Sequence, residues 1–389
     1  MNALFSMFLS EFRALFTVHR RGAAALAFLP MAYLLLFGGL FAKNAVNEAA
    51  IGVCDLDGSA ESRRLIRALD DADALSVRLV GTLGETETAY RRGDILAYAV
   101  IPQDYAENLR RGVPVSVEVV ANNANTVLGN TAMNGFQAVV DTIGAERAAE
   151  NRIARGVPSE AAGALAAPVQ LSLRSLYNST GGYNDFFTSV LLLHALQIAA
   201  VFTVAPMMAL EKCRPQENSR PLCRLFAKAF ALSAWLTLSL LFSLLCGIVL
   251  LGMTCRAPLL PLAFLGFSFA FAMTAFAFAV GAWVRKPSST ISYTLFYIMP
   301  SVLFSGAVWP RASMDGVSRF LSWVMPIGYA AIDFRELLVR GDAPTLGEDC
   351  AILVAIGLAF LAFARFGLLR KEAARNARSL GTGTFPAAG

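Results

Sequence analysis

The sequence predicts an α-helical polytopic membrane protein with six transmembrane helices and an extracytoplasmic α/β domain inserted between helices one and two. Hydrophobic residues make up 56% of the chain and charged residues only 16%, whereas soluble proteins contain about 45–50% apolar and about 25% charged residues. The mean hydropathy is +0.55. Apolar runs of about 20 residues, enough to cross the hydrocarbon core of a bilayer, recur along the chain, and a more polar segment separates the first run from the others. The lipid bilayer is therefore the main solvent of this protein.

The N-terminal segment predicts a surface helix followed by a first span. Residues 1–21 are expected to form an amphipathic helix on the cytoplasmic membrane surface, because apolar side chains recur there at helical spacing. Residues 22–42 are expected to form the first transmembrane helix. A cleavable signal peptide is the alternative, but its apolar region covers only about 7–15 residues. The apolar positions of the surface helix are Leu4, Phe5, Phe8, Phe12, Leu15 and Phe16.

Residues 43–185 have the character of a soluble α/β domain. Short apolar runs typical of strands alternate there with amphipathic helical segments. Asp55–Ser59 follows the first strand and predicts a turn with a helix cap. The predicted strands are Ile51–Cys54, Ile95–Ile101 and Val115–Val120, and the predicted helices are Glu61–Leu69, 122–143 and 144–155.

Residues 186–369 are expected to form a five-helix transmembrane region, because each of five apolar runs is long enough for one crossing. Residues 311–330 lie within this region but are too short to cross, which predicts a re-entrant or interfacial segment. Residues 370–389 follow as a cytoplasmic tail. The five runs are Phe186–Leu210, Phe230–Gly252, Pro258–Val284, Ile291–Val308 and Cys350–Leu369.

The positive charges predict the orientation of the chain. They gather in the connections that six spans would place on one side, whereas the short opposite loop between the third and fourth spans carries only Arg256. The positive-inside rule then places both termini in the cytoplasm and the α/β domain outside. This distribution accounts for the net charge of +5, so a nucleic-acid partner is not needed to explain it. The basic residues are Arg13, Arg20, Arg21, Lys212, Arg214, Arg220, Arg224, Lys228, Arg285, Lys286, Arg370, Lys371, Arg375 and Arg378.

The sequence contains no motif that carries catalysis. It has no GxxxxGK[ST] loop to hold the phosphates of a nucleotide, and neither HExxH nor GxSxG. Its six cysteines form no CxxC pair. His19 and His194 are expected on different sides of a span, so they do not share a metal. We therefore expect a chain that is not an enzyme and that binds neither a metal nor a cofactor.

Several segments together resemble one family. The segments are Ser10–Arg13 with Arg20, Arg21 and Pro30, Ile51–Leu69 (IGVCDLDGSAESRRLIRAL), Tyr90–Tyr105 (YRRGDILAYAVIPQDY), Leu176–Asn178, and Leu303–Pro310 (LFSGAVWP) with Pro326 and Arg335. With the order of surface helix, span, outer domain and further spans, they resemble the ABC-2 type (type V) ABC exporter permeases with a large periplasmic domain, a multidrug-efflux subgroup.

The resemblance implies a transmembrane permease subunit in the bacterial inner membrane that exports an amphipathic or hydrophobic compound. ATP and Mg²⁺ would be bound by a separate ABC ATPase subunit. The permease would pair with a second permease as a homodimer or heterodimer. A periplasmic adaptor and an outer-membrane channel are further partners that the resemblance implies. The sequence does not identify the cargo.

One segment departs from the family pattern. The cytoplasmic loop Glu211–Lys228 reads EKCRPQENSRPLCRLFAK and lacks the family's Gly-Thr-Leu-Glu-like motif. Only the role of this loop is carried over, namely contact with the ATPase. A solvated loop that merely follows the positive-inside rule is the alternative. The coupling candidates are Glu211, Lys212, Arg214 and Glu217.

Polar side chains inside the predicted spans are scarce. His194 and Gln197 are three residues apart on the second span, which places them on one helix face. A second stripe on the fifth span contains Tyr293, Tyr297 and Ser301 and continues to Ser305. The resemblance implies that these helices line the transport path. Hydrogen bonding between helices, worth about 0.6–2 kcal/mol a pair, is the alternative.

Two other function classes compete with export. A membrane-anchored receptor or envelope-assembly protein would act through its outer α/β domain, but five spans after that domain are many for an anchor. A secondary transporter would usually need charged residues at mid-membrane, and the predicted spans contain almost none.

Overall fold

The computed structural model describes residues 2–41, 49–121, 126–159, 161, 184–211 and 221–381. The chain divides into two compact units. Residues 45–174 form one, called here the α/β unit, which lies within the predicted domain 43–185. Residues 1–44 and 175–389 form the other, called here the helical unit. Each is described by itself.

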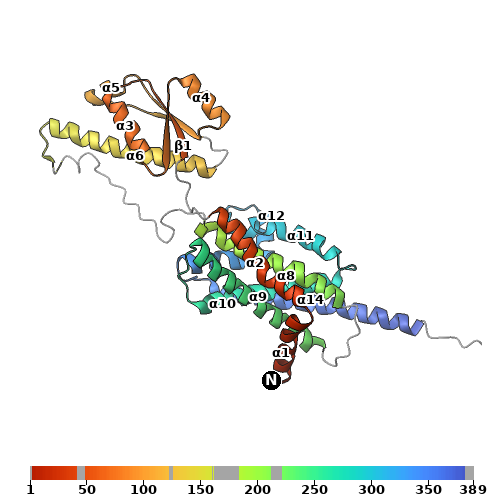
Figure 1. Cartoon of the computed structure of the whole chain (residues 1–389). Coiled ribbons are helices and arrows are strands. Elements are labelled where there is room, and N and C mark those ends of the chain that lie inside the picture. The colour runs from red at the N-terminus through yellow and green to blue at the C-terminus, as the bar shows by residue number, and fades with distance from the viewer. Residues whose placement is uncertain are drawn as a thin grey trace, which may run out of the picture. The chain divides into compact units, whose positions relative to one another are not determined.

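The α/β unit is built on a four-stranded sheet with the order β2-β1-β3-β4 (Figure 1). The pairs β1–β2 and β1–β3 are parallel, and β4 is antiparallel to β3. The strands are β1 (Ala49–Asp55), β2 (Leu75–Val80), β3 (Ala97–Ile101) and β4 (Glu118–Ala121). The helices are α3 (Ala60–Asp70), α4 (Leu83–Arg92), α5 (Tyr105–Arg111) and α6 (Thr126–Ala154).

The two faces of this sheet are covered by different helices. Alternate residues of β1, Ile51 and Val53, pack with α3 and α6 in one apolar core. The opposite face meets α4, where a Cβ on Gly52 would lie 3.5 Å from the side chain of Thr86. Ser59 begins α3 by accepting hydrogen bonds from two backbone amides of its first turn, as the sequence predicts.

Three elements of the α/β unit were not predicted. The strand β2 lies at an edge of the sheet and is mostly exposed, so its sequence LSVRLV lacks a buried stripe. The helices α4 and α5 are short and carry many charges. The two helices predicted within 122–155 are one continuous helix, α6, over the described residues.

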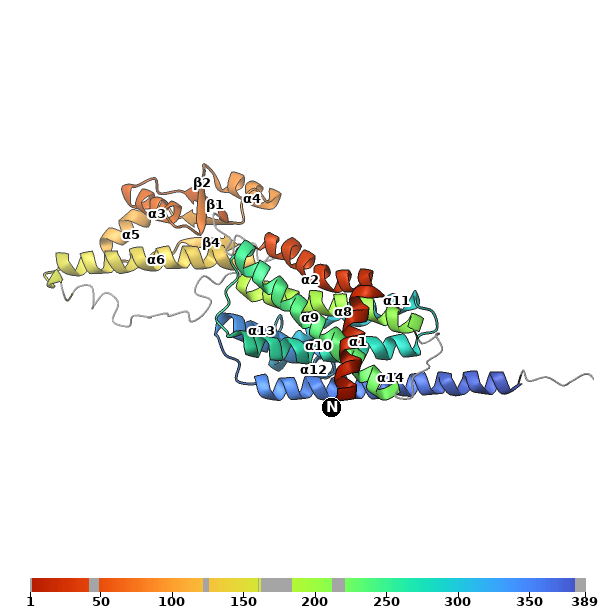
Figure 2. The same ribbon diagram turned by 60° about the horizontal axis from the view of Figure 1, so that its bottom comes forward.

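The helical unit consists of helices packed side by side, with α1 running crosswise to α8, α10 and α14 (Figure 2). Its helices are α1 (Asn2–Thr17), α2 (Arg20–Leu40), α8 (Ser189–Glu211), α9 (Pro221–Leu251), α10 (Leu259–Trp283), α11 (Ser289–Ser301), α12 (Gly316–Val324), α13 (Ile327–Val339) and α14 (Leu346–Gly381). Short turns of other helix types cover Asn184–Thr188, Leu303–Ser305 and Arg311–Ser313.

Within the described residues, five helices are long and apolar enough to cross a bilayer. The chain is thus a multi-pass membrane protein. All five overlap predicted spans: the first span near the start of the chain and four of the five in its second half. These helices cover Arg20–Leu40, Phe186–Glu211, Pro221–Leu251, Leu259–Trp283 and Leu346–Ala373.

The remaining predicted span, Ile291–Val308, is shorter in the structure. The helix α11 ends at Ser301, one residue after Pro300, and Gly306 has a left-handed φ of 79°. At 13 residues, α11 extends for about 20 Å. The count of six spans therefore stays a prediction. The segment predicted to be re-entrant contains α12 and the start of α13, a helix that was not predicted.

The core of the helical unit lies around α8 and α10, which are more buried than the other long helices. Gly281 of α10 lies directly against α8, because a Cβ there would come 2.6 Å from the carbonyl oxygen of Ala205. The helix α14 packs along α10. The outward faces of α2, α9 and α14 carry exposed leucines and phenylalanines, as expected where lipid is the solvent.

Candidate functional site

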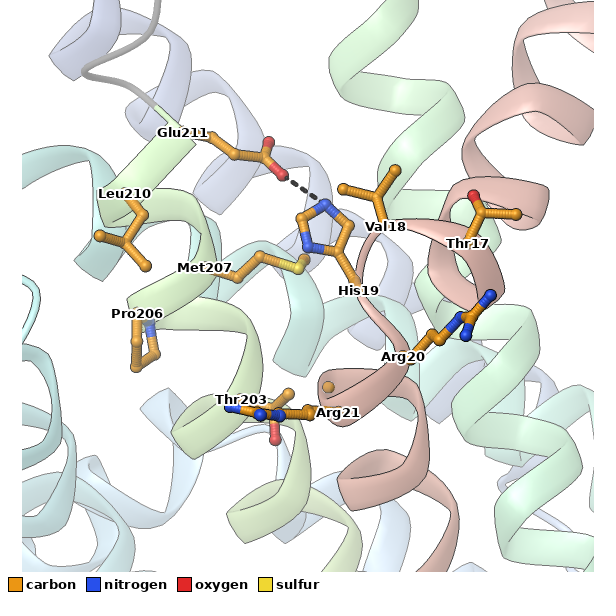
Figure 3. Close-up of a pocket in the computed structure, with 11 residues that line it drawn as sticks. Thr17, Val18, His19, Arg20, Arg21, Thr203, Pro206, Met207, Leu210 and Glu211 are labelled. Atoms are coloured by element: carbon orange, nitrogen blue, oxygen red, sulfur yellow. Dashed lines mark ion pairs between the residues drawn. The ribbon is translucent and has the colours of Figure 1, made fainter.

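The carboxylate of Glu211, the last residue of α8, joins three elements of the helical unit. His19, in the turn between α1 and α2, places its Nε2 3.1 Å from one carboxylate oxygen of Glu211 (Figure 3). The Nζ of Lys228 on α9 pairs with the other oxygen. Lys228 is only 7% exposed, so its ammonium depends on Glu211 for compensation. Glu211 thus connects the start of α2, the end of α8 and the first turns of α9.

The surface helix α1 is attached to α9 by polar and aromatic contacts. The Nε of Arg224 donates to Glu11 at 2.8 Å. The ring of Phe16 meets the ring of Trp235 edge to face at 4.8 Å between centroids. Trp235 also donates from its Nε1 to the carbonyl oxygen of Ala23 on α2. A displacement of α1 would therefore be transmitted to α2 and α9.

The sequence singled out only part of this arrangement. Glu211 is present as a predicted coupling residue, whereas Lys212, Arg214 and Glu217 lie outside the described residues. Lys228 was counted only among the topology-setting charges, although it is buried. The signal available in the sequence was its position inside a helical apolar pattern, where a lysine requires a partner.

A polar cluster lies inside the helical unit between α8 and α11. Gln197 Nε2 lies 2.6 Å from His194 Nδ1 and donates to Ser301 Oγ, also at 2.6 Å. Ser301 in turn donates to the carbonyl oxygen of Ile298. All three polar residues are buried, Gln197 to 1% exposure. The structure thus brings together three of the predicted path residues from both helices.

The two tyrosines of the predicted path behave differently from each other. The Tyr297 ring packs on Phe276 at 4.4 Å between centroids, and its hydroxyl is buried without a hydrogen-bond partner among the described residues. Tyr293 is 68% exposed and does not join the cluster. The Oε1 atom of Gln197 is likewise buried and unpaired within the described part of the chain. The cluster therefore retains unused hydrogen-bonding capacity. Ser305 bonds locally, to the carbonyl oxygen of Val302.

A buried carboxyl on α13 was missed by the sequence analysis. Asp333 is 0% exposed, and one of its oxygens accepts a hydrogen bond of 2.7 Å from Thr345 Oγ1. Burial raises the pKa of Asp333, and Glu336 raises it further, while the hydrogen bonds from Thr345 and Asp349 lower it. The described residues contain no group of three or more side chains suited to hold a metal ion.

Five long apolar helices, the Glu211 ion pairs and a buried polar cluster define a multi-pass membrane protein with a separate α/β unit. A sequence profile of the family described as ABC-2 family transporter protein matches residues 25–366. The match covers most of the chain, and the chain belongs to this family. It is therefore a membrane subunit of an ABC transporter, and membership implies that it pairs with an ABC ATPase subunit. No curated protein matches the chain.

Proposed function

We propose that the chain is the permease subunit of an ABC exporter that moves an amphipathic or hydrophobic compound out of the cytoplasm or the inner membrane. ATP and Mg²⁺ are bound on the partner ATPase, which hydrolyses the ATP. The observation that carries the proposal is the Glu211 cluster, because it joins α2, α8 and α9 at the point where the chain leaves α8 for the loop 212–220.

The mechanism follows from these contacts. Closure of the ATPase pushes on the loop 212–220 and on α1. The loop is continuous with Glu211, and α1 is attached to α9 through Glu11 and Arg224. The push therefore reaches α2, α8 and α9 together. A Lys228 ammonium that is nearly out of water keeps its partner through the motion, because separating the two costs several kcal/mol (about 3–5).

The path for the cargo is proposed along α8 and α11. His194, Gln197 and Ser301 supply hydrogen-bonding groups there, and polar groups in membrane helices tend to face the interior of the bundle.

The opposite face of α11 exposes Phe296 and Met299. That apolar face is proposed to meet a second permease, identical or related, so that the path lies in a dimer. The α/β unit is proposed to lie outside the membrane, where an adaptor leading to an outer-membrane channel would bind.

The test is purification of the full chain with a co-expressed phosphate-loop ABC ATPase from the same organism. A stable complex is expected, and in proteoliposomes its ATP hydrolysis should exceed that of the ATPase alone. Glu211→Gln should reduce this stimulation. Its control for charge removal is Glu372→Gln, because Glu372 is exposed and pairs with Arg365 and not with the Glu211 cluster. Failure of the two chains to associate would refute the exporter and favour a receptor or envelope-assembly role.

A further inference from the structure

A cavity of about 530 Å³ lies between the α1–α2 turn and the end of α8. Figure 3 shows the two sides of this cavity, with the turn on one side and α8 on the other. The volume is in the range of small-ligand sites, about 300–1,000 Å³. The turn contributes Thr17, Val18, His19, Arg20, Arg21 and Gly22, and α8 contributes Thr203, Pro206, Met207, Leu210 and Glu211.

The charged lining of the cavity favours an anion. Arg20 donates from its Nε to the carbonyl oxygen of Phe16 on α1, and its guanidinium lies on the α1 side of the turn, away from α8 (Figure 3). The side chain of Arg21 points from the turn toward α8 (Figure 3), and Arg21 forms no ion pair with the described residues. The one acid in the lining, Glu211, is already paired with Lys228 and His19, so it does not cancel the arginines.

The apolar lining and the position of the cavity narrow the class of anion. Val18 and Leu210 are both exposed, at 65% and 58%, and Met207 lies between them along the cavity wall (Figure 3). The helices α2 and α8 are both long enough to span a bilayer, so their ends lie at headgroup level. An anion bound here would have its charge beside the arginines and an apolar part beside Val18 and Leu210. A phospholipid, whose phosphate is attached to acyl chains, has this combination. One arginine can donate two parallel hydrogen bonds to two oxygens of the same phosphate, which a lysine cannot do.

We propose that this cavity binds the phosphate headgroup of an anionic phospholipid, with Arg21 as its ligand, Arg20 adding positive charge at the rim, and Val18 and Leu210 against the start of the acyl chains. Basic pockets between membrane helices bind such headgroups in other proteins. The bound lipid would bridge the α1–α2 turn to α8, beside the His19–Glu211 pair. The proposal concerns binding and does not depend on the exporter function.

The test measures lipid binding to the purified, delipidated full chain by native mass spectrometry. The probes are phosphatidylglycerol, phosphatidylcholine and inorganic phosphate. Retention of phosphatidylglycerol over phosphatidylcholine is expected, with a roughly 10-fold or greater loss of retention in Arg20→Gln/Arg21→Gln. The matched control is Arg285→Gln/Lys286→Gln, which removes the same charge from exposed positions outside the cavity and should bind as the unmodified chain does.

A second variant guards against a folding defect. Met207→Trp keeps every charge but places a larger side chain in the cavity wall, and it should also weaken phosphatidylglycerol retention. Equal losses in the cavity and control variants would overturn the proposal, since they would show only general attraction to a basic surface. Competition by inorganic phosphate as strong as that by the lipid would also overturn it, because the site would then bind the free anion.

Discussion

Lys228 of α9 and Glu211 of α8 form an ion pair in which the lysine is almost completely removed from solvent. The two residues are 17 positions apart, on either side of residues 212–220. His19 approaches the same carboxylate from the turn before α2. A charge pair with so little solvent around it favours one relative position of the three elements.

Glu211→Gln is expected to destabilise the protein by about 3 kcal/mol, near the lower end for a buried pair because Glu211 keeps some solvent contact. The reason is the uncompensated Lys228 ammonium. Thermal unfolding of the purified permease measures the loss. The double variant Glu211→Leu/Lys228→Met removes both charges and should recover most of the stability without recovering ATPase stimulation. Recovery of both would mean that the pair has no part in coupling.

Tyr297→Phe tests the path, because the hydroxyl it removes has no partner among the described residues. Removing an unpaired buried hydroxyl should leave stability unchanged or slightly higher. We expect efflux of a lipophilic dye from proteoliposomes to change by several-fold, in a dimer that still assembles. Tyr293→Phe, at an exposed position, is the control. Equal dye efflux in both variants would remove Tyr297 from the path.

His194→Ala tests the polar cluster from the α8 side. It removes the ring that meets Gln197 on the same helix at 2.6 Å, and the loss of one such hydrogen bond should cost about 0.5–1.5 kcal/mol. Transport should fall while assembly persists. A parallel loss of assembly and transport would instead support a purely structural cluster.

Gly281→Ala is expected to destabilise the helical unit by about 3 kcal/mol or more, because the added Cβ would meet the backbone oxygen of Ala205 at 2.6 Å. The oxygen belongs to a packed helix and has no room to move. Gly39→Ala is the matched control, since a Cβ there meets nothing within 4 Å. Helix propensity should make that control neutral or more stable by up to about 1 kcal/mol. A Gly281 variant as stable as the control would contradict the close approach of α8 and α10.

Asp333 predicts a pH dependence of stability. Its pKa is raised from 3.8, first by burial, so the folded protein holds the proton more tightly than the unfolded chain. The contribution is complete below 3.8 and is lost as the pH rises through the folded pKa. Asp333→Asn should flatten this part of the unfolding profile. The exposed Asp342→Asn should leave it unchanged, and the same slope in both variants would exclude Asp333 as its source.

The proposed topology is open to labelling in intact cells. In a cysteine-free background, Thr88→Cys on α4 and Ser10→Cys on α1 place single thiols at exposed positions. A membrane-impermeant maleimide should label Thr88→Cys at once and Ser10→Cys only after permeabilisation. The reverse pattern would place the α/β unit in the cytoplasm.

The long apolar helices were predictable because their signal is local. The run of residues 186–210 is apolar whatever it packs against, and only lipid or a large core accommodates it. The first turn of the α/β unit was predictable for the same reason, since Ser59 caps the amides that directly follow it. In the same unit, the edge strand β2 was not predicted, because the strand is mostly exposed and its apolar pattern is weak.

Contacts between distant parts of the chain were not predictable. Nothing near His19 in sequence indicates Glu211, and Lys228 looks like one more cytoplasmic charge until the packing of α9 buries it. The helix α13 was missed because Asp333, Arg335 and Glu336 interrupt its apolar pattern. Those charges are tolerated because folding supplies partners, such as Thr345 for Asp333 and the carbonyl oxygen of Ala307 for Arg335.

In the described part of the chain, the polar side chains on the inner face of α11 make few hydrogen bonds to the neighbouring helix α8. The hydroxyls of Thr290 and Thr294 bond to the backbone of their own turn. Among the described residues, the side-chain hydrogen bond from α8 to α11 is that of Gln197 to Ser301. One amide hydrogen bond resists axial sliding of α11 less than the close contact between Gly281 and the backbone of Ala205 resists sliding of α10 along α8. Small axial shifts of α11 along α8 should therefore cost less than shifts between α8 and α10.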